Sequence, residues 1–243
     1  MLEVTDRFLN WIKEGTDRID FSADWKGNLV SHCIPKRYSA YCKIMHPMRR
    51  DRKIIDERLL WSETGESVPH EFDMGEKITY KALAQKYHLN YTKEISTHTF
   101  LRHFGGSLPR YLIAPDEGEM ECSLVKEMMD ILKPFTEENK VYFCYSLLKV
   151  IQWKQDDLVY CGNLEDVLTL CTKEELNGSP TYWWPEDKSW CVCTDYDLDF
   201  TLVGGSEELI HRFLSNRELE SIEVESHTRI DYRADENNLP HNK

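Results

Sequence analysis

The chain has 243 residues, of which 41% are hydrophobic and 12% aromatic, and this apolar content is enough for a core and excludes wholesale disorder. Its 30 Lys and Arg stand against 43 Asp and Glu, and the net charge of −13 disfavours nucleic acid and anionic membranes as partners, because both bind positive surfaces. No apolar run approaches the roughly 18 residues of a membrane-spanning helix, so we expect no membrane partner.

The acidic charge is concentrated in the second half of the chain. Residues 1–110 carry 18 Lys and Arg against 15 Asp and Glu, whereas residues 111–243 carry 12 against 28. Such an acidic surface attracts a basic protein partner. Solubility alone is the plainer explanation of the same composition, and the sequence leaves both explanations open.

The helices and strands expected in the first half follow from the spacing of apolar residues and from the capping, Gly and Pro residues at their ends. Residues 2–13 predict a helix, because their apolar side chains fall on one face. Residues 38–45 predict a strand, and residues 62–77 are polar and predict a loop. A helix over 80–88 is expected to begin at Thr79, a good N-cap residue.

The second half predicts further helices and strands of the same kinds. The residues at 141–147 are apolar on both faces, which is typical of a buried strand. The other expected elements are a helix over 124–133 capped by Ser123, a helix over 164–170 capped by Asn163, a strand over 189–194, a helix over 207–214 capped by Ser206, and a last strand over 219–224.

These elements mix without a regular β-α-β rhythm, which favours an α+β fold with a mixed or antiparallel sheet and helices packed on it. We expect one domain over residues 1–230 and a flexible acidic or polar tail over 231–243. If there are two subdomains, their boundary is expected near 110–120, where the charge balance changes.

The cysteines indicate a reducing environment. Six of the eight lie in apolar segments, where a free thiol behaves as a small hydrophobe. The chain is long enough to fold without disulfides, and the N-terminus lacks the basic and apolar regions of a secretory signal. We therefore expect free thiols and a cytoplasmic protein.

The most distinctive stretch is a run of tryptophans followed by alternating aspartates. If residues 190–202 form one continuous strand, successive side chains point to opposite faces. One face is then apolar, and the other changes from thiols to carboxylates. The three carboxylates on that second face belong to Asp195, Asp197 and Asp199.

Carboxylates about 6.5–7 Å apart along a strand repel one another unless water, a basic side chain or a cation screens them. Hard cations bind carboxylate oxygens, so Asp195, Asp197 and Asp199 are candidate ligands for Mg²⁺ or Ca²⁺. A solvent-facing strand end with turn-forming aspartates is the plainer explanation, and our leading expectation is that the protein needs no cofactor.

Other chemical motifs are weaker. Gly204, Gly205 and Ser206 resemble a phosphate-binding loop in outline, but the acidic first turn of the helix that follows would repel an anion, which favours a turn and helix cap. The sequence has no Walker A, GxGxxG, GxSxG, HExxH or CxxC motif. His46, His98 and His103 are most simply structural unless the fold brings them together.

Residues 183–206 read WWPxDxSWCVxTDxDLxxTxVGGS, where x marks the positions that are not part of the motif. This run resembles the C-terminal signature of an uncharacterised family of bacterial cytoplasmic proteins, and looser similarity extends over residues 38–224. The resemblance implies an intracellular bacterial protein and brings no activity with it.

Two functions follow as hypotheses. The first is a non-enzymatic, protein-binding module of the immunity or antitoxin type, which docks its acidic surface and exposed tryptophans onto a basic partner. Its expected binding residues are Trp183, Trp184, Asp187, Asp195, Asp197 and Asp199. The alternative is a metal-dependent hydrolase, or a phosphoryl or nucleotidyl transferase, built on the three aspartates at 195, 197 and 199.

Overall fold

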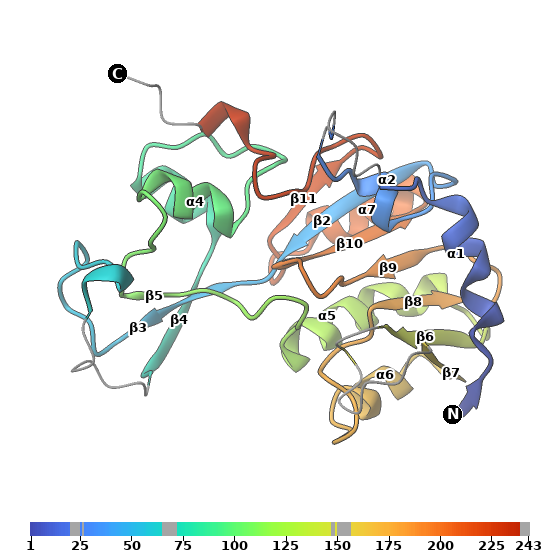
Figure 1. Cartoon of the computed structure of the whole chain (residues 1–243). Coiled ribbons are helices and arrows are strands. Elements are labelled where there is room, and N and C mark those ends of the chain that lie inside the picture. Colours follow the sequence, from blue (N-terminus) through green and yellow to red (C-terminus); the bar gives the residue numbers. More distant parts are fainter. Residues whose placement is uncertain (20–24, 26, 65–71, 147–148, 150–156, 239–243) are drawn as a thin grey trace. The chain divides into compact units, whose positions relative to one another are not determined.

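The chain folds into two compact units (Figure 1). The computed structural model describes residues 1–19, 25, 27–64, 72–146, 149 and 157–238. Unit 1 comprises residues 1–46 and 116–228, and unit 2 comprises residues 47–115 and 229–243. One border between the units, after Pro115, lies inside the 110–120 stretch where the charge balance changes.

Unit 1 is built on an eight-stranded antiparallel sheet with the order β1-β7-β6-β8-β9-β10-β2-β11 (Figure 1). In that order the strands are Leu2–Val4, Leu158–Gly162, Val141–Tyr145, Tyr182–Pro185, Cys191–Cys193, Phe200–Gly205, Ala40–Met45 and Ser221–Val224. All five residues of β6 are buried, as its continuous apolar run predicts. The α+β class and the antiparallel sheet are thus confirmed.

Three helices cover one face of this sheet: α5 (Cys122–Leu132), α6 (Asp166–Leu170) and α7 (Glu207–Ser215). Their apolar side chains and those of the sheet form one core cluster, which removes the inward face of each helix from water. Two tryptophans lie at the centre of this cluster, with the rings of Trp183 and Trp190 in edge contact at 5.9 Å between centroids.

The N-terminal segments cover the opposite face. Because strand side chains alternate, Tyr142 and Trp184 point away from the core that Phe143 and Trp183 fill. In η1 (Asp6–Leu9), Phe8 stacks on Tyr142 with 4.6 Å between ring centroids. In α1 (Asn10–Gly15), Trp11 meets Trp184 at 5.9 Å. The sheet is therefore packed on both faces.

The Gly-Gly-Ser segment ends β10 and starts α7. A Cβ at Gly204 would lie 2.6 Å from Cδ2 of Tyr38 and 2.7 Å from Cγ2 of Ile34, just after α2 (Val30–Cys33), so only glycine fits there. Both glycines belong to the strand and not to the turn that the sequence suggests. The predicted cap is confirmed, because the Ser206 side chain accepts a hydrogen bond from the N–H of Leu209 at 3.2 Å.

Unit 2 contains a three-stranded sheet with the order β4-β3-β5, formed by Met74–Ile78, Met48–Asp51 and Leu112–Ile113. Its helical segments are η2 (Trp61–Glu63), α3 (Tyr80–Lys86), α4 (Thr97–His103) and η5 (Glu236–Asn238). Thr79 caps α3 as predicted, because its hydroxyl oxygen accepts a hydrogen bond from the N–H of Ala82 at 3.1 Å.

Unit 2 contains a buried ion pair. Nη1 of Arg110 lies 2.8 Å from Oδ2 of Asp51, and the two side chains are 2% and 0% exposed. The guanidinium carbon of Arg110 also lies 4.0 Å from the centroid of the Trp61 ring. Burying either charge alone would cost several kcal/mol, and the attraction between the two charges offsets that cost.

Residues 231–238, which the sequence places in a flexible tail, are packed within unit 2. Asp235 is 1% exposed and accepts hydrogen bonds from Thr99 Oγ1 at 2.8 Å and from Asn238 Nδ2 at 2.7 Å. Buried Ile230 and Ala234 anchor the same segment. The remainder of the predicted tail, 239–243, and residues 65–71 of the predicted loop lie outside the described residues.

Three predicted helix starts differ from the structure. Residues 2–4 form β1 and pair with β7, so the predicted N-terminal helix is wrong there. Helix α5 begins before Ser123, whose hydroxyl contacts Glu121 Oε2 at 3.2 Å instead of capping the helix. At α6 the Asn163 side chain is predicted to cap the helix. Instead, Asp166 Oδ2 accepts a hydrogen bond from the backbone N–H of Asn163 at 2.9 Å.

Candidate functional site

The aspartate run forms a loop and not the second half of a long strand. Strands β9 and β10 are antiparallel neighbours, with Cys193 opposite Leu202, and residues 194–199 connect them. The Asp195 carboxylate accepts the N–H of Asp197 at 3.1 Å, and the Asp195 carbonyl accepts the N–H of Leu198 at 3.1 Å. Aspartate favours this kind of turn, so its turn chemistry prevails over the alternating pattern, and the continuous strand over 190–202 is wrong.

The three aspartates have different surroundings. Asp197 is exposed, Asp195 is half-buried and Asp199 is 7% exposed. Burial raises the pKa of Asp195, although the hydrogen bond from the Asp197 N–H opposes the shift. Within the residues that the structure describes, no group of three or more His, Cys, Asp or Glu side chains is arranged to hold a metal ion. The structure therefore does not bring the three candidate ligands together in that way.

The tryptophans do not offer the exposed anchors that the sequence suggests. Trp183 is 0% and Trp184 1% exposed, because β8 lies inside the sheet and both faces of the sheet are covered. Asp187 is exposed, but it lies in the turn between β8 and β9, at the other end of β9 from Asp195. The expected binding residues are thus divided between the core and two opposite ends of the hairpin.

A second acidic loop, residues 116–121, packs against the aspartate loop. The N–H of Gly118 donates a hydrogen bond to the carbonyl of Leu198 at 2.8 Å. Gly118 has φ of 73°, and a Cβ there would lie 2.6 Å from the Cα of Tyr196. Glycine therefore permits both the left-handed backbone and the close approach of the two loops.

We call residues 116–121 and 195–199 the acidic loop pair. Its two segments lie far apart in the sequence and meet through their backbones at one end of the sheet of unit 1. Asp116, Glu117 and Asp197 are exposed, and the others are half-buried or buried. The full set is Asp116, Glu117, Glu119, Glu121, Asp195, Asp197 and Asp199.

A buried histidine lies beneath the acidic loop pair. His46 follows β2, is 1% exposed, and its backbone N–H donates to the Asp199 carbonyl at 3.2 Å. Its Nε2 lies 2.9 Å from Thr201 Oγ1, which is 2.8 Å from Thr194 Oγ1. Its Nδ1 has no hydrogen-bond partner among the described residues. Burial lowers the pKa of His46 to about 4, although the Asp199 charge opposes the shift, so the ring is neutral at pH 7.

A buried lysine connects the acidic loop pair to its surroundings. Lys149 is 2% exposed, and its Nζ donates hydrogen bonds to the carbonyl oxygens of Gly118 and, at 2.9 Å, of Ser179. Burial lowers the pKa of Lys149 to about 8, and the carboxylates of Glu119 and Asp195 oppose the shift. This cation lies inside a region whose outer surface is acidic.

The remaining sequence candidates lie elsewhere. His46 belongs to unit 1, whereas His98 and His103 lie in α4 of unit 2, so the three histidines are not brought together within one unit. Cys191 and Cys193 are free and fully buried, which confirms their place in the core. Sequence reasoning missed the second acidic loop, His46 as its neighbour, and Lys149. The signal for the loop was present in Glu117-Gly118-Glu119, but its partner is about 80 residues away.

The fold and this site define an α+β protein that presents two hydrogen-bonded acidic loops at one end of an antiparallel sheet. The chain belongs to the family described as protein of unknown function (DUF2711), whose family model matches residues 29–234. Neither the curated proteins nor the solved structures contain a match to this chain. Within the described residues, every helix is too short or too polar to cross a bilayer.

Proposed function

We propose that the protein is a non-enzymatic binding module that docks a basic protein partner on the acidic loop pair. The observation that carries the proposal is the contact between the two loops, in which Gly118 and Leu198 share a 2.8 Å hydrogen bond. It brings acidic residues from two segments to one end of the sheet. Complementary charge of this kind speeds encounter and selects the partner.

The charge of unit 1 supports the same function. Unit 1 carries 16 Lys and Arg against 31 Asp and Glu, whereas unit 2 carries 14 against 12. The field around unit 1 therefore attracts cations and repels nucleic acid and anionic lipid.

Binding to a basic protein is also the expected property of an immunity or antitoxin protein, and we place this protein in that class within the cytoplasm of a bacterium. All eight cysteines are free thiols, which suits a reducing compartment. This class requires a tight, stoichiometric partner, and that requirement is open to direct test.

The test uses the full chain as bait in an extract of the source cells, followed by elution with increasing salt. We expect one stoichiometric partner with an excess of Lys and Arg, which elutes as salt screens the charges. The loop variant Asp195→Asn with Asp197→Asn should release it at lower salt. A matched control, Glu3→Gln with Asp6→Asn, changes the charge equally at exposed positions around β1 and should not. Capture of nothing, or equal elution from both variants, would refute the proposal.

The metal-dependent enzyme remains the competing hypothesis for Asp195, Asp197 and Asp199. Calorimetric titration of the full chain with Mg²⁺, Mn²⁺ and Ca²⁺ separates it from protein binding. The binding-module proposal predicts no saturable heat with any of the three ions. A stoichiometric heat that the Asp195→Asn, Asp197→Asn variant abolishes would favour the enzyme instead.

A further inference from the structure

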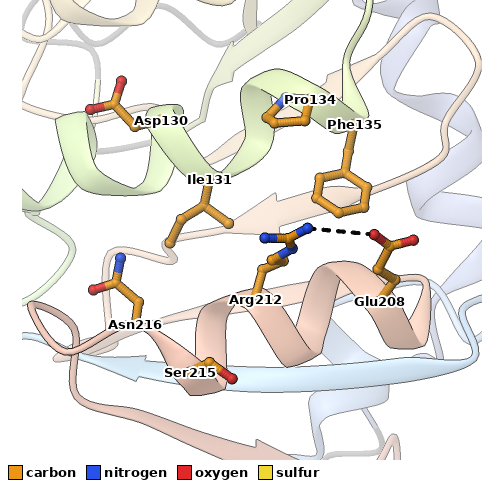
Figure 2. A pocket seen from close by; sticks show the side chains of 8 residues that line it. All are labelled: Asp130, Ile131, Pro134, Phe135, Glu208, Arg212, Ser215 and Asn216. Carbon is orange, nitrogen blue, oxygen red and sulfur yellow. Dashed lines mark ion pairs between the residues drawn. The ribbon is translucent and has the colours of Figure 1, made fainter.

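A groove lies between α5 and α7 on the helical face of unit 1 (Figure 2). It continues past the C-terminal end of α5 into η3 (Lys133–Phe135), and its volume is about 600 Å³. Ile131, Pro134 and Phe135 supply apolar surface, and Asp130 and Glu208 supply carboxylates. The groove therefore combines an apolar floor with a rim that carries two carboxylates and the guanidinium of Arg212.

One cation lies within the groove. Figure 2 shows the Arg212 side chain between Phe135 and α7, with its guanidinium turned toward Glu208. The ion pair is long, at 3.9 Å between Nη2 and Oε1, and the two side chains are 67% and 73% exposed. Asp130 is paired with Lys126 on the same helix at 2.9 Å, and both are at least half exposed.

Exposed ion pairs on a helix contribute little to stability and exchange readily with other charges. A cation brought by a ligand can therefore replace Lys126 at Asp130, or Arg212 at Glu208, at little cost. An anionic ligand meets a different situation, because unit 1 carries 31 acidic against 16 basic side chains. The acidic charge of unit 1 thus favours a cationic occupant, and the apolar floor of the groove favours one that also carries apolar side chains.

The groove and the acidic loop pair are joined by one helix. Residue 121 of the acidic loop pair directly precedes α5, and the groove begins near its last turn at Asp130 and Ile131. An 11-residue α-helix is about 16 Å long. A partner helix of similar length, lying along α5, reaches from one site to the other.

We infer that the α5–α7 groove is a docking site for a basic amphipathic helix of the partner protein, with its apolar side chains on Ile131 and Phe135 and its Lys or Arg side chains at Asp130 and Glu208. This inference rests on the proposed function and names the partner's binding element. Helices of this kind commonly bind hydrophobic grooves through residues spaced at i, i+3, i+4 and i+7.

The probe for the test is a synthetic peptide of leucine and lysine, about 14 residues long, with leucines at i, i+3, i+4 and i+7. Two comparison peptides keep its length: one has the same composition in scrambled order, and the other has glutamate in place of lysine. Binding to the full chain is measured by calorimetry at low salt. We expect the amphipathic basic peptide to bind at least tenfold more tightly than either comparison peptide.

Two groove variants locate the binding. Asp130→Asn with Glu208→Gln removes the rim carboxylates, and Phe135→Ala removes part of the floor. We expect each to weaken the peptide about tenfold, while Glu3→Gln with Asp6→Asn, which has the same charge change as the rim variant, leaves it unaltered. Thermal unfolding checks that Phe135→Ala is folded, and the rim variant changes only exposed side chains.

The outcomes separate the inference from the proposed function. If groove variants bind the basic peptide like the wild type, or the scrambled or glutamate peptide binds equally well, the groove inference fails. If a groove variant changes the oligomeric state in sedimentation, the groove is a contact between copies and the inference also fails. A captured partner that is lost by the loop variant but kept by both groove variants would retain the proposed function and overturn only the groove.

Discussion

At the scale of single residues, a buried histidine in unit 1 and a buried ion pair in unit 2 have the clearest consequences for the stability of each unit. His46 is enclosed at one end of the sheet of unit 1 and is neutral because burial lowers its pKa to about 4. Asp51 and Arg110 are enclosed in unit 2 and are both charged, 2.8 Å apart. The first group destabilises the fold when it gains a proton, and the second pair does so when one partner is removed.

His46 predicts a stability change in acid. The unfolded imidazole takes up its proton near pH 6.5 and the folded one only near pH 4, so stability falls as the pH drops between these values. The full shift is worth about 3 kcal/mol. Urea unfolding at pH 7 and pH 4.5 should show most of this loss in the wild type, and His46→Gln should reduce it. The exposed His227→Gln serves as control, and an equal pH dependence in all three proteins would contradict the account.

Removal of the Arg110 guanidinium should destabilise unit 2 strongly. Arg110→Met leaves the Asp51 charge buried without its partner, and we expect a loss of about 3–5 kcal/mol in the free energy of unfolding. Adding Asp51→Asn should recover more than half of that loss, because the amide still accepts from the N–H of Lys53 while the charge is gone. Denaturant unfolding measures both. A double variant as unstable as the single one would show that packing, and not charge, is responsible.

At the scale of elements, local chemistry was predictable and non-local pairing was not. The buried strand β6 and the caps at Thr79 and Ser206 follow from apolar runs and short-range hydrogen bonds. The pattern over 190–202 alternates equally well in a strand and in two strands joined by aspartate turns, so periodicity could not decide. Residues 2–4 became a strand only because β7, more than 150 residues away, offers an edge.

The same reasoning explains why the sequence identified one loop of the site and not the loop that packs against it. Asp195, Asp197 and Asp199 were identified from sequence, but their partner loop at 116–121 is defined by a tertiary contact. Trp183 and Trp184 seemed suited to binding because of their type, yet the neighbours that bury them, such as Phe143 beside Trp183 and Trp11 beside Trp184, come from other elements. Burial depends on topology that composition alone does not contain.

Because the two acidic loops pack closely at Gly118, adding one methyl group there should lower the free energy of unfolding substantially. Gly118→Ala should cost about 1–3 kcal/mol, because the backbone is left-handed and the new Cβ meets Tyr196. Gly105→Ala is the matched control, since its φ of 71° is nearly the same but nothing lies within 4 Å of the added carbon. Urea unfolding of both should show the larger loss for Gly118→Ala. Equal losses would mean that backbone strain alone acts and that the loops are not tightly packed.

At the scale of the whole molecule, charge is divided between the units. Unit 1 has 31 acidic and 16 basic side chains, whereas unit 2 has 12 and 14. The acidity is therefore a property of the sheet unit that carries the acidic loop pair and the groove. A general need for solubility gives no reason for this division, while a docking surface on unit 1 does.

The most direct test of the central claim is the salt dependence of the affinity between the full chain and its captured partner. We predict that Kd rises steeply with salt in the wild type, and that Asp195→Asn with Asp197→Asn gives a weaker complex with a shallower salt dependence. Glu3→Gln with Asp6→Asn should follow the wild-type curve. A Kd that is independent of salt, or the same curve for the loop variant and the wild type, would contradict the account.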